Sequence, residues 1–495
     1  MVLSIDEMTV FCKKKGFVYQ TGELYGGLSG FYDYGHLGVE LKNNIKALLW
    51  KHFVQDREDV VGIDGSIITH PKVWQASGHV ECFTDILLEC KQCHTRFRAD
   101  HIIEEKLKIH AEGLKPEDIN KIVQQNKLQC EKCKGELTGA NPFHLMLETN
   151  IGPVTGNTAY LRPETAQLIF TNFKLVQEHA RMKLPFGIAQ QGKAFRNEIS
   201  PRDFLFRMRE FEQFEIEFFT HPKKTNDCPF FSEVENIKVT VLLEKDKEHK
   251  SLTLGDLTKK SLTNRWHLYW LGKFYQFFLE YGIQPGHLRL RQHSKSELAH
   301  YAKACFDIEY QFPFGWKEIH GNADRGQFDL EQHQKFSKQD MQYFDQEGNE
   351  KVLPAVAAEP SQGIERAFLA FLFDAYEYSK ERENIVLHVH PKLAPMKVGV
   401  FPLINKLDKE ALTVFQMLKK EFPCQFDRSG SIGRRYARAD EIGIPYCITV
   451  DFDSAKGKDV TLRDRETTKQ KRIKSAQLAG TIKKLLQGEI QFADL

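Results

Sequence analysis

Residues 186–220 constrain the fold most tightly, because they combine an apolar stretch, a polar loop and a return stretch that mixes acidic and apolar residues. Side chains of a β-strand alternate between its two faces, so near-regular alternation indicates a strand. The segment therefore predicts an antiparallel hairpin with its loop at 197–203. We expect the acidic residues of the return strand to project from one face: Glu210, Glu212, Glu215 and Glu217.

Patterns on both sides of the hairpin complete an α+β prediction. Apolar residues recur at helical spacing over 37–58, and a β-like run at 60–69 stops before Pro71, which lacks a backbone donor. Residues 363–378 form a strongly apolar helical stretch. Strands and helices alternate over 391–495, which predicts a separate small α/β domain.

Composition argues against several classes of protein. The chain of 495 residues is long enough for about three domains, and its 41% hydrophobic and 27% charged residues are ordinary for a globular protein. No apolar run approaches the roughly 20 residues of a membrane helix, and charges near the N-terminus argue against a secretory signal. Ten cysteines are too few for a disulfide scaffold, so we expect a reduced, cytoplasmic protein with no membrane partner.

The net charge of +2 is unevenly distributed along the chain. Residues 391–495 carry 20 Lys and Arg against 13 Asp and Glu, a net of +7, so the preceding residues carry −5. A basic C-terminal segment on a slightly acidic body indicates a polyanionic partner such as a nucleic acid. A solvated charged face is the alternative explanation.

Two C-x-x-C pairs, Cys90 with Cys93 and Cys130 with Cys133, are separated by 36 residues. Such pairs present four thiolates to one tetrahedral Zn²⁺, and four protein ligands are typical of a structural site. The alternative is four unrelated reduced thiols. The polar, mostly helical residues 99–129 between the pairs have the character of an insertion.

Two short motifs suit phosphate binding. Residues 195–198 follow a strand, and Arg196 and Glu198 point to the same side of an extended chain, where they can hold a phosphate and a base amino group. Residues 359–366 leave a small-residue strand and enter a helix whose N-terminus favours an anion, with Arg366 in its first turn. Taken alone, the first motif is better explained as a surface ion pair, and the second is compatible with plain packing.

In this order, the strand that ends at Pro71, the loop opened by residues 195–198 and the strand–helix at 359–366 resemble motifs 1, 2 and 3 of class II aminoacyl-tRNA synthetases. The resemblance is sharpest to the homodimeric glycyl-tRNA synthetase family, and it runs from about residue 16 to the C-terminus. Further segments similar to that family's signatures are 30–35, 37–42, 74–79, 97–101, 162–167 and 359–361.

This resemblance implies an antiparallel-sheet catalytic domain, a small insertion that carries the cysteine pairs, and a C-terminal α/β anticodon-binding domain. The helix at 37–58 would lie in the homodimer interface, although internal packing explains its pattern equally well. The expected boundaries are 1–86 and 144–390 for the catalytic domain, 87–143 for the insertion, about 223–265 for a second insertion, and 391–495 for the anticodon-binding domain.

The resemblance also implies a reaction, in which ATP activates glycine to glycyl-adenylate plus pyrophosphate and glycine then passes to the 3′ end of tRNA-Gly. Arg196, Glu198 and Arg366 would be catalytic, with Arg196 stabilising charge that develops on the α-phosphate. Glu318 would help to hold Mg²⁺ on the ATP. The implied ATP-binding residues are Arg196, Asn197, Glu198, Phe206, Arg207, Met208, Arg209, Glu210, Phe211, Glu318, Ile319, Gly363, Ile364, Glu365 and Arg366.

Glycine has no side chain to recognise, so selection needs a pocket too small for other amino acids and acids that hold the ammonium group. The implied glycine-binding residues are Arg98, Glu164, Phe211, Glu212, Gln213, Phe214, Glu215, Glu359, Pro360, Ser361, Gln362 and Gly363. Arg434, Arg435 and Arg438 would contact tRNA phosphates, with Tyr436 available to stack on a base.

Two other hypotheses compete with a glycine–tRNA ligase. A catalytically dead relative would use the fold only to bind nucleic acid, but Arg196 and Arg366 are both present. Another class II synthetase, for histidine, threonine or proline, would share the three motifs. The acidic set expected around the amino-acid pocket argues against that alternative.

Overall fold

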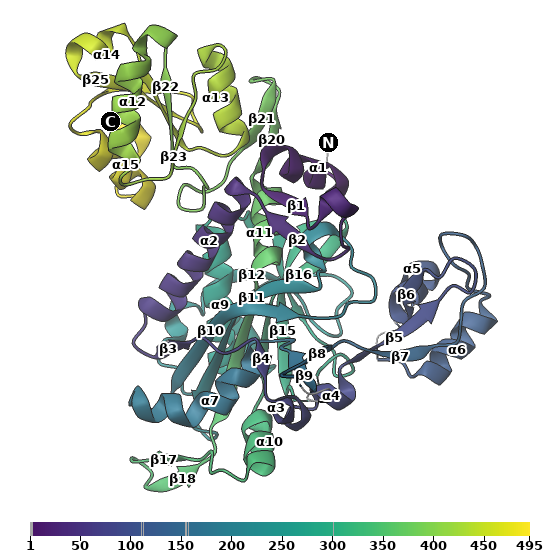
Figure 1. Ribbon diagram of the computed structural model, residues 1–495. Coiled ribbons are helices and arrows are strands. Elements are labelled where there is room, and N and C mark those ends of the chain that lie inside the picture. Colours follow the sequence, from purple (N-terminus) through teal and green to yellow (C-terminus); the bar gives the residue numbers. More distant parts are fainter. Residues whose placement is uncertain (1–2, 110, 112, 154–155, 157, 300) are drawn as a thin grey trace.

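The structure is a computed structural model that describes residues 3–495 except 110, 112, 154, 155, 157 and 300. Figure 1 shows a large central body, a small domain that projects from its side, and a C-terminal domain at one end. Within the described residues, no helix is both long enough and apolar enough to cross a membrane.

A nine-stranded sheet forms the centre of the large body. The predicted hairpin is confirmed, because β10 and β11 pair antiparallel with Phe195 opposite Glu210. Among the described strands of this sheet, β12–β14 and β10–β3 are the parallel pairs. In spatial order the strands are β13 (Lys250–Thr253), β12 (Lys238–Leu242), β14 (Leu288–Gln292), β15 (Ala304–Phe312), β16 (Gly315–Asp324), β19 (Ala355–Gly363), β11 (Glu210–Thr220), β10 (Phe186–Phe195) and β3 (Val60–Ile63).

Helices cover both faces of this sheet. The predicted helix at 37–58 is confirmed as α2 followed by a π-helical turn, and it buries Leu41, Ile45 and Phe53 in the main core. On the opposite face, α7 packs against Phe219 of β11. The elements concerned are α2 (His36–Trp50), η2 (Lys51–Gln55), α7 (Ala166–His179), α9 (Arg265–Glu280) and α11 (Ile364–Ala375).

The acidic residues of β11 do not share one face, so that sequence prediction is wrong. Glu212 lies two residues from the core residue Phe214, so the two side chains share a face of the strand. Glu215 and Glu217 lie an odd number of residues from Phe214 and therefore face the other side. Because successive side chains of a strand alternate, the two pairs of acids diverge. Glu212 accordingly contacts Lys42 of α2 at 2.7 Å, away from the face that carries Glu215.

The β-like run at 60–69 is divided between two sheets. Its first part is β3, and its second part joins a three-stranded sheet. Pro71 begins helix α3, and the His70 ring accepts a hydrogen bond from the amide of Lys72 at 3.2 Å. These elements are β4 (Ile68–Thr69), β9 (Thr158–Leu161), β8 (Leu147–Asn150) and α3 (Pro71–Ala76).

The domain that projects from the body carries both cysteine pairs and has its own small core, including Leu88, Ile103 and Ile119. It consists of β6 (Arg96–Arg98), β5 (Thr84–Glu89), β7 (Asn141–His144), α5 (Ala99–Leu107) and α6 (Pro116–Gln125). Residues 223–265, by contrast, supply the edge strands β13 and β12 of the central sheet together with α8 (Leu254–Lys259).

The C-terminal domain alternates strands and helices, as the sequence predicts, and packs around Val400, Ile448 and Leu462. Its five-stranded sheet contains β23 (Cys424–Phe426), β22 (Val398–Pro402), β24 (Tyr446–Val450), β25 (Asp459–Asp464) and β26 (Gln470–Lys474). Its helices are α12 (Asp408–Leu418), α13 (Ile432–Glu441), α14 (Phe452–Gly457) and α15 (Leu478–Gln487).

Short elements complete the body. They are α1 (Ile5–Lys15), β1 (Val18–Gln20), η1 (Glu23–Tyr25), β2 (Tyr32–Tyr34), α4 (His79–Cys82), η3 (Phe204–Phe206), η4 (Phe231–Glu233), η5 (Pro285–His287), α10 (Phe328–Ser337), β17 (Tyr343–Asp345), β18 (Glu350–Val352), β20 (Tyr376–Ser379) and β21 (Asn384–Leu387), with η6 (Asn405–Leu407) and η7 (Phe492–Asp494) in the C-terminal domain.

Candidate active site

A pocket of about 290 Å³ lies on the central sheet, where β11, β15, β16 and β19 run side by side. The structure brings fourteen of the predicted site residues into its lining: Glu164, Arg196, Glu198, Phe206, Arg207, Met208, Phe211, Gln213, Glu215, Glu318, Glu359, Ser361, Gly363 and Arg366. Segments from both halves of the chain therefore converge on one cavity.

Two arginines define one part of the pocket. Arg366, in the first turn of α11, contacts Glu318 at 2.8 Å and lies over the Phe206 ring at 4.5 Å from its centroid. Arg196, at the end of β10, donates to the Pro163 carbonyl at 3.1 Å and lies 5.3 Å from the centroid of Phe211. Both guanidiniums are only half-buried, so they remain accessible to an anionic ligand in the pocket.

The loop between β10 and β11 is fixed by backbone contacts. Arg209 donates to the Glu198 carbonyl from Nε and Nη2, at 3.0 and 2.9 Å. The Glu198 carboxylate faces Arg207 at 3.4 Å. These contacts leave Glu198 at the rim of the pocket while the loop that carries it is held on the sheet.

Buried carboxylates define another part of the pocket. Glu215 of β11 lies opposite Ser361 of β19, whose hydroxyl donates to it at 2.8 Å, and the Thr165 amide donates to its other oxygen at 2.9 Å. Glu359, two residues before Ser361, projects from the same face and contacts Arg325. The third acid of the group is Glu164, whose carboxylate lies 3.4 Å from Nε2 of His79.

This group contains more acidic than basic side chains. Burial and the neighbouring Glu164 raise the pKa of Glu215, and burial raises the pKa of Glu359 to about 8 although Arg325 opposes the shift. Burial also disfavours the charged form of Glu164, but His79 and Arg325 outweigh it and lower the pKa of that carboxyl. A bound cation would relieve the repulsion among these carboxylates, so the pocket suits an ammonium group.

Several predicted residues do not line the pocket, and the position of each one in the structure explains why. Phe214, Ile319 and Ile364 are core residues, Pro360 and Gln362 have the opposite parity on β19, and Asn197 and Arg209 lie in the loop that joins β10 to β11. Glu210 pairs with Lys193 at the surface, Glu212 and Glu365 pair with Lys42, and Arg98 pairs with Asp85 and Asp100 in the projecting domain.

Sequence reasoning missed other residues of the pocket. His293, Cys305 and Asp307 form part of its wall, and burial and the Glu318 charge raise the pKa of Asp307 to about 6. Behind the acidic group, Arg325 donates to Asp329 at 2.8 Å from two nitrogens. Only the alternation of β15, which places Cys305 and Asp307 on one face, offered a local signal for these residues.

The four predicted cysteines converge in the projecting domain. Cys90 Sγ lies 3.4 Å from Cys133 Sγ, and Cys93 Sγ lies 3.5 Å from Cys130 Sγ. All four sulfurs lie within 4.8 Å of one another, close to the spacing that Zn–S bonds of about 2.3 Å require. The donor set therefore fits a structural zinc ion.

Zinc in this site should stabilise the projecting domain. We expect the purified chain to hold zinc at this cluster and the variant Cys90→Ser to carry one equivalent less, because three thiolates bind far more weakly than four. Metal analysis by mass spectrometry checks this, with Cys82→Ser, an exposed cysteine outside the cluster, as the control. Less than about 0.2 equivalents in folded wild-type protein would contradict a zinc site.

Comparison with known proteins decides the family. A glycine–tRNA ligase of Clostridium kluyveri is 45% identical over 98% of this chain and 99% of the relative. A glycine–tRNA ligase of Caldanaerobacter subterraneus subsp. tengcongensis is 43% identical over 99% of each chain. The chain belongs to the glycine–tRNA ligase family.

The solved structures agree with this assignment at the level of the fold. A prolyl-tRNA synthetase of Cryptosporidium parvum, solved with halofuginone and AMPPNP, superposes with a TM-score of 0.58 at 14% identity, covering 98% of this chain and 75% of that one. The predicted α+β class II synthetase fold is thereby confirmed. Residues 397–485 also match the family model described as an anticodon binding domain.

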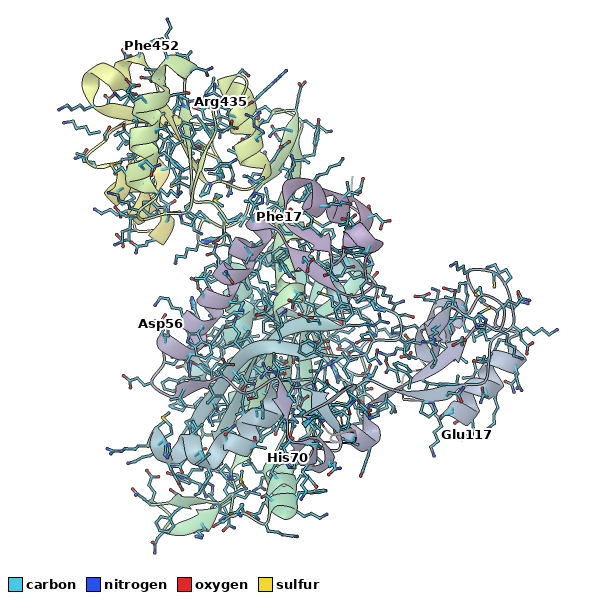
Figure 2. All side chains as sticks on the ribbon, viewed as in Figure 1. Phe17, Asp56, His70, Glu117, Arg435 and Phe452 are labelled. Carbon is cyan, nitrogen blue, oxygen red and sulfur yellow. The ribbon has the colours of Figure 1, made fainter. Side chains whose placement is uncertain are left out.

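In this member of the glycine–tRNA ligase family, the three arginines predicted for tRNA have different surroundings on α13. Arg434 is exposed, whereas Arg438 contacts Asp427 at 2.6 Å. Arg435, labelled in Figure 2 in the C-terminal domain, is buried and donates to the carbonyls of Pro402 and Gly430. In this arrangement Arg435 holds the domain together and is not available to a phosphate.

Tyr436 is not free to stack on a base either. Its hydroxyl hydrogen-bonds Thr449 at 2.5 Å, and its ring lies under Arg463 at 4.7 Å from the guanidinium carbon. The sequence predicts the basic character of this segment, but it does not separate the residues that face the sheet from those that face solvent.

Proposed function

We propose that the chain is a glycine–tRNA ligase that activates glycine with ATP and then transfers it to tRNA-Gly. The observation that carries this proposal is a single pocket with accessible arginines in one part and an excess of buried carboxylates in another. A polyphosphate and an ammonium group are the two charged ends of the substrates that such a reaction must hold together.

For ATP, Arg196 would bind the α-phosphate and stabilise the charge that forms there as the glycine carboxylate attacks. Arg366 would bind the γ-phosphate, and the adenine would stack on Phe211, with its amino group donating to Glu198. The carboxylate of Glu318 fits Mg²⁺, which would neutralise phosphate charge when bound. Arg366 would then exchange its contact with Glu318 for one with phosphate.

For glycine, Glu164, Glu215 and Glu359 would surround the ammonium group, with Ser361 holding Glu215 in place. Selection of glycine would require the space beside its Cα to be closed, so that a methyl group collides with the pocket wall. Rejection by collision is stronger than the roughly 1 to 3 kcal/mol that a loose pocket gains per methylene.

The test is ATP–pyrophosphate exchange without tRNA, run with each of the twenty amino acids. We expect exchange with glycine alone, because the proposed glycine pocket would exclude larger side chains. Exchange with another amino acid would keep the synthetase fold and discard the glycine assignment. No exchange from folded protein would favour a relative that only binds nucleic acid.

The variant Glu215→Gln tests the ammonium site separately. It is expected to raise the glycine KM at least 100-fold while leaving the ATP KM within about 3-fold, because a buried charge that contacts the ammonium is lost. The control is Glu178→Gln, a carboxylate near the end of α7 that lies outside the pocket. Equal effects on both substrates would contradict the assignment of Glu215.

The remaining parts of the proposal concern partners. The C-terminal domain would bind the anticodon arm of tRNA-Gly, with Arg434 and Arg438 at the phosphates, and the projecting domain would contact the acceptor arm. Two copies of the chain would pair through the region of α2, in the cytoplasm, where the ten cysteines would stay reduced. Deletion of residues 87–143 should raise the tRNA KM, and an unchanged value would remove the acceptor-arm role.

A further inference from the structure

Three further side chains of types that ligate metal ions converge on the pocket wall, separate from the four-cysteine cluster. Cys305 and Asp307 lie two residues apart on β15, so their side chains share a face. The adjacent strand β14 pairs Gln292 with Phe306, so the next residue, His293, lies opposite Cys305. The His293 amide donates to the Cys305 carbonyl at 3.1 Å, which fixes this register.

The atoms are close enough for one ion. A nitrogen of His293, the sulfur of Cys305 and an oxygen of Asp307 all lie within 4.8 Å of one another, and His293 Nε2 is 2.6 Å from Asp307 Oδ2. A tetrahedral zinc ion with bonds of about 2.0 to 2.3 Å holds its ligands about 3.5 Å apart. Side-chain shifts of about 1 Å would therefore admit the ion without moving either strand.

Charge at the cluster favours a cation. A Cβ placed on Gly321 would lie 3.4 Å from Glu318 Oε1 and 3.8 Å from Asp307 Oδ1, so two carboxylates face each other across this glycine. The guanidinium of Arg291 is 4.0 Å from Asp307 but is held by a closer contact with Glu297. An ion at the cluster would thus meet net negative charge.

We propose that His293, Cys305 and Asp307 form a second metal site, which takes Zn²⁺ or a similar thiophilic divalent ion and opens onto the pocket. Imidazole and thiolate ligands select such ions over Mg²⁺, which prefers oxygen. Three protein ligands leave a fourth position for water or a substrate atom, unlike the closed four-cysteine cluster. The ion at this site would be additional to the magnesium that accompanies ATP.

The test is titration of the metal-stripped full chain with Co²⁺, followed by the thiolate–cobalt charge-transfer absorption. We expect a cobalt equivalent that is lost in Cys305→Ser and in His293→Ala but is retained in Cys90→Ser. The matched control is Cys82→Ser, whose exposed thiol belongs to neither cluster and which should bind as the wild type does. Circular dichroism checks that each variant is folded.

Two results would overturn this second site. The first is unchanged cobalt binding in Cys305→Ser and His293→Ala, which would show that the bound metal lies outside this cluster. Displacement of the cobalt by excess Mg²⁺ would show a site for hard ions. Neither readout depends on amino-acid activation, so a failure here is distinguishable from a failure of the proposed glycine–tRNA ligase activity.

Discussion

Replacing Arg196 with alanine should reduce glycine-dependent ATP–pyrophosphate exchange about 100- to 1,000-fold, with the protein still folded. The expected loss is that of one preorganised group that stabilises charge in a transition state. The Arg196 side chain is half-buried, donates a hydrogen bond to the Pro163 carbonyl and contacts two aromatic rings. Its removal therefore leaves no buried charge without a partner.

Arg202→Ala is the matched control for this variant, because Arg202 lies in the same loop but contacts Glu105 at the surface. The control should exchange at the wild-type rate in the absence of tRNA. Thermal unfolding of both variants should remain close to that of the wild type. Full exchange by Arg196→Ala would contradict the role of motif 2 in activation.

Much of this fold could be predicted from local patterns. The hairpin at 186–220 and the helix at 37–58 have strong periodicity over many residues, and their formation depends mainly on that periodicity. The cysteine pairs could be predicted for a similar reason, since metal-ligand spacing is local. The position of each strand in a nine-stranded sheet was beyond such reasoning, because it depends on contacts between distant segments.

The candidate site shows that a sequence motif does not by itself tell which of its residues face the pocket. Glu212 and Glu215 lie in one motif, yet their odd spacing sends them to opposite faces, one to Lys42 and one to the pocket. Counting parity along β11 would have separated them. Arg435 and Arg434 are neighbours with opposite environments, and here helix orientation decides.

Arg325 lies behind the acids that we propose to bind glycine, and its replacement by methionine should lower the stability of the protein strongly. Its side chain is fully buried, contacts Asp329 and Glu359, and lies 3.7 Å from the centroid of Tyr301. Methionine fills much of the volume but leaves two buried carboxylates without their cation. Breaking a buried pair in this way costs about 3 to 5 kcal/mol.

Chemical denaturation checks this expectation, because the catalytic domain of Arg325→Met should unfold at a lower denaturant concentration than that of the wild type. The matched control is Arg428→Met, which breaks an ion pair with Asp408 whose arginine is 67% exposed, and which should change stability by about 1 kcal/mol or less. Exchange assays on Arg325→Met should also show a raised glycine KM, because Glu359 loses the contact that orients it. If Arg325→Met were as stable as the control, the acids would have to be neutral in the folded protein. The excess negative charge proposed to attract the glycine ammonium would then be absent.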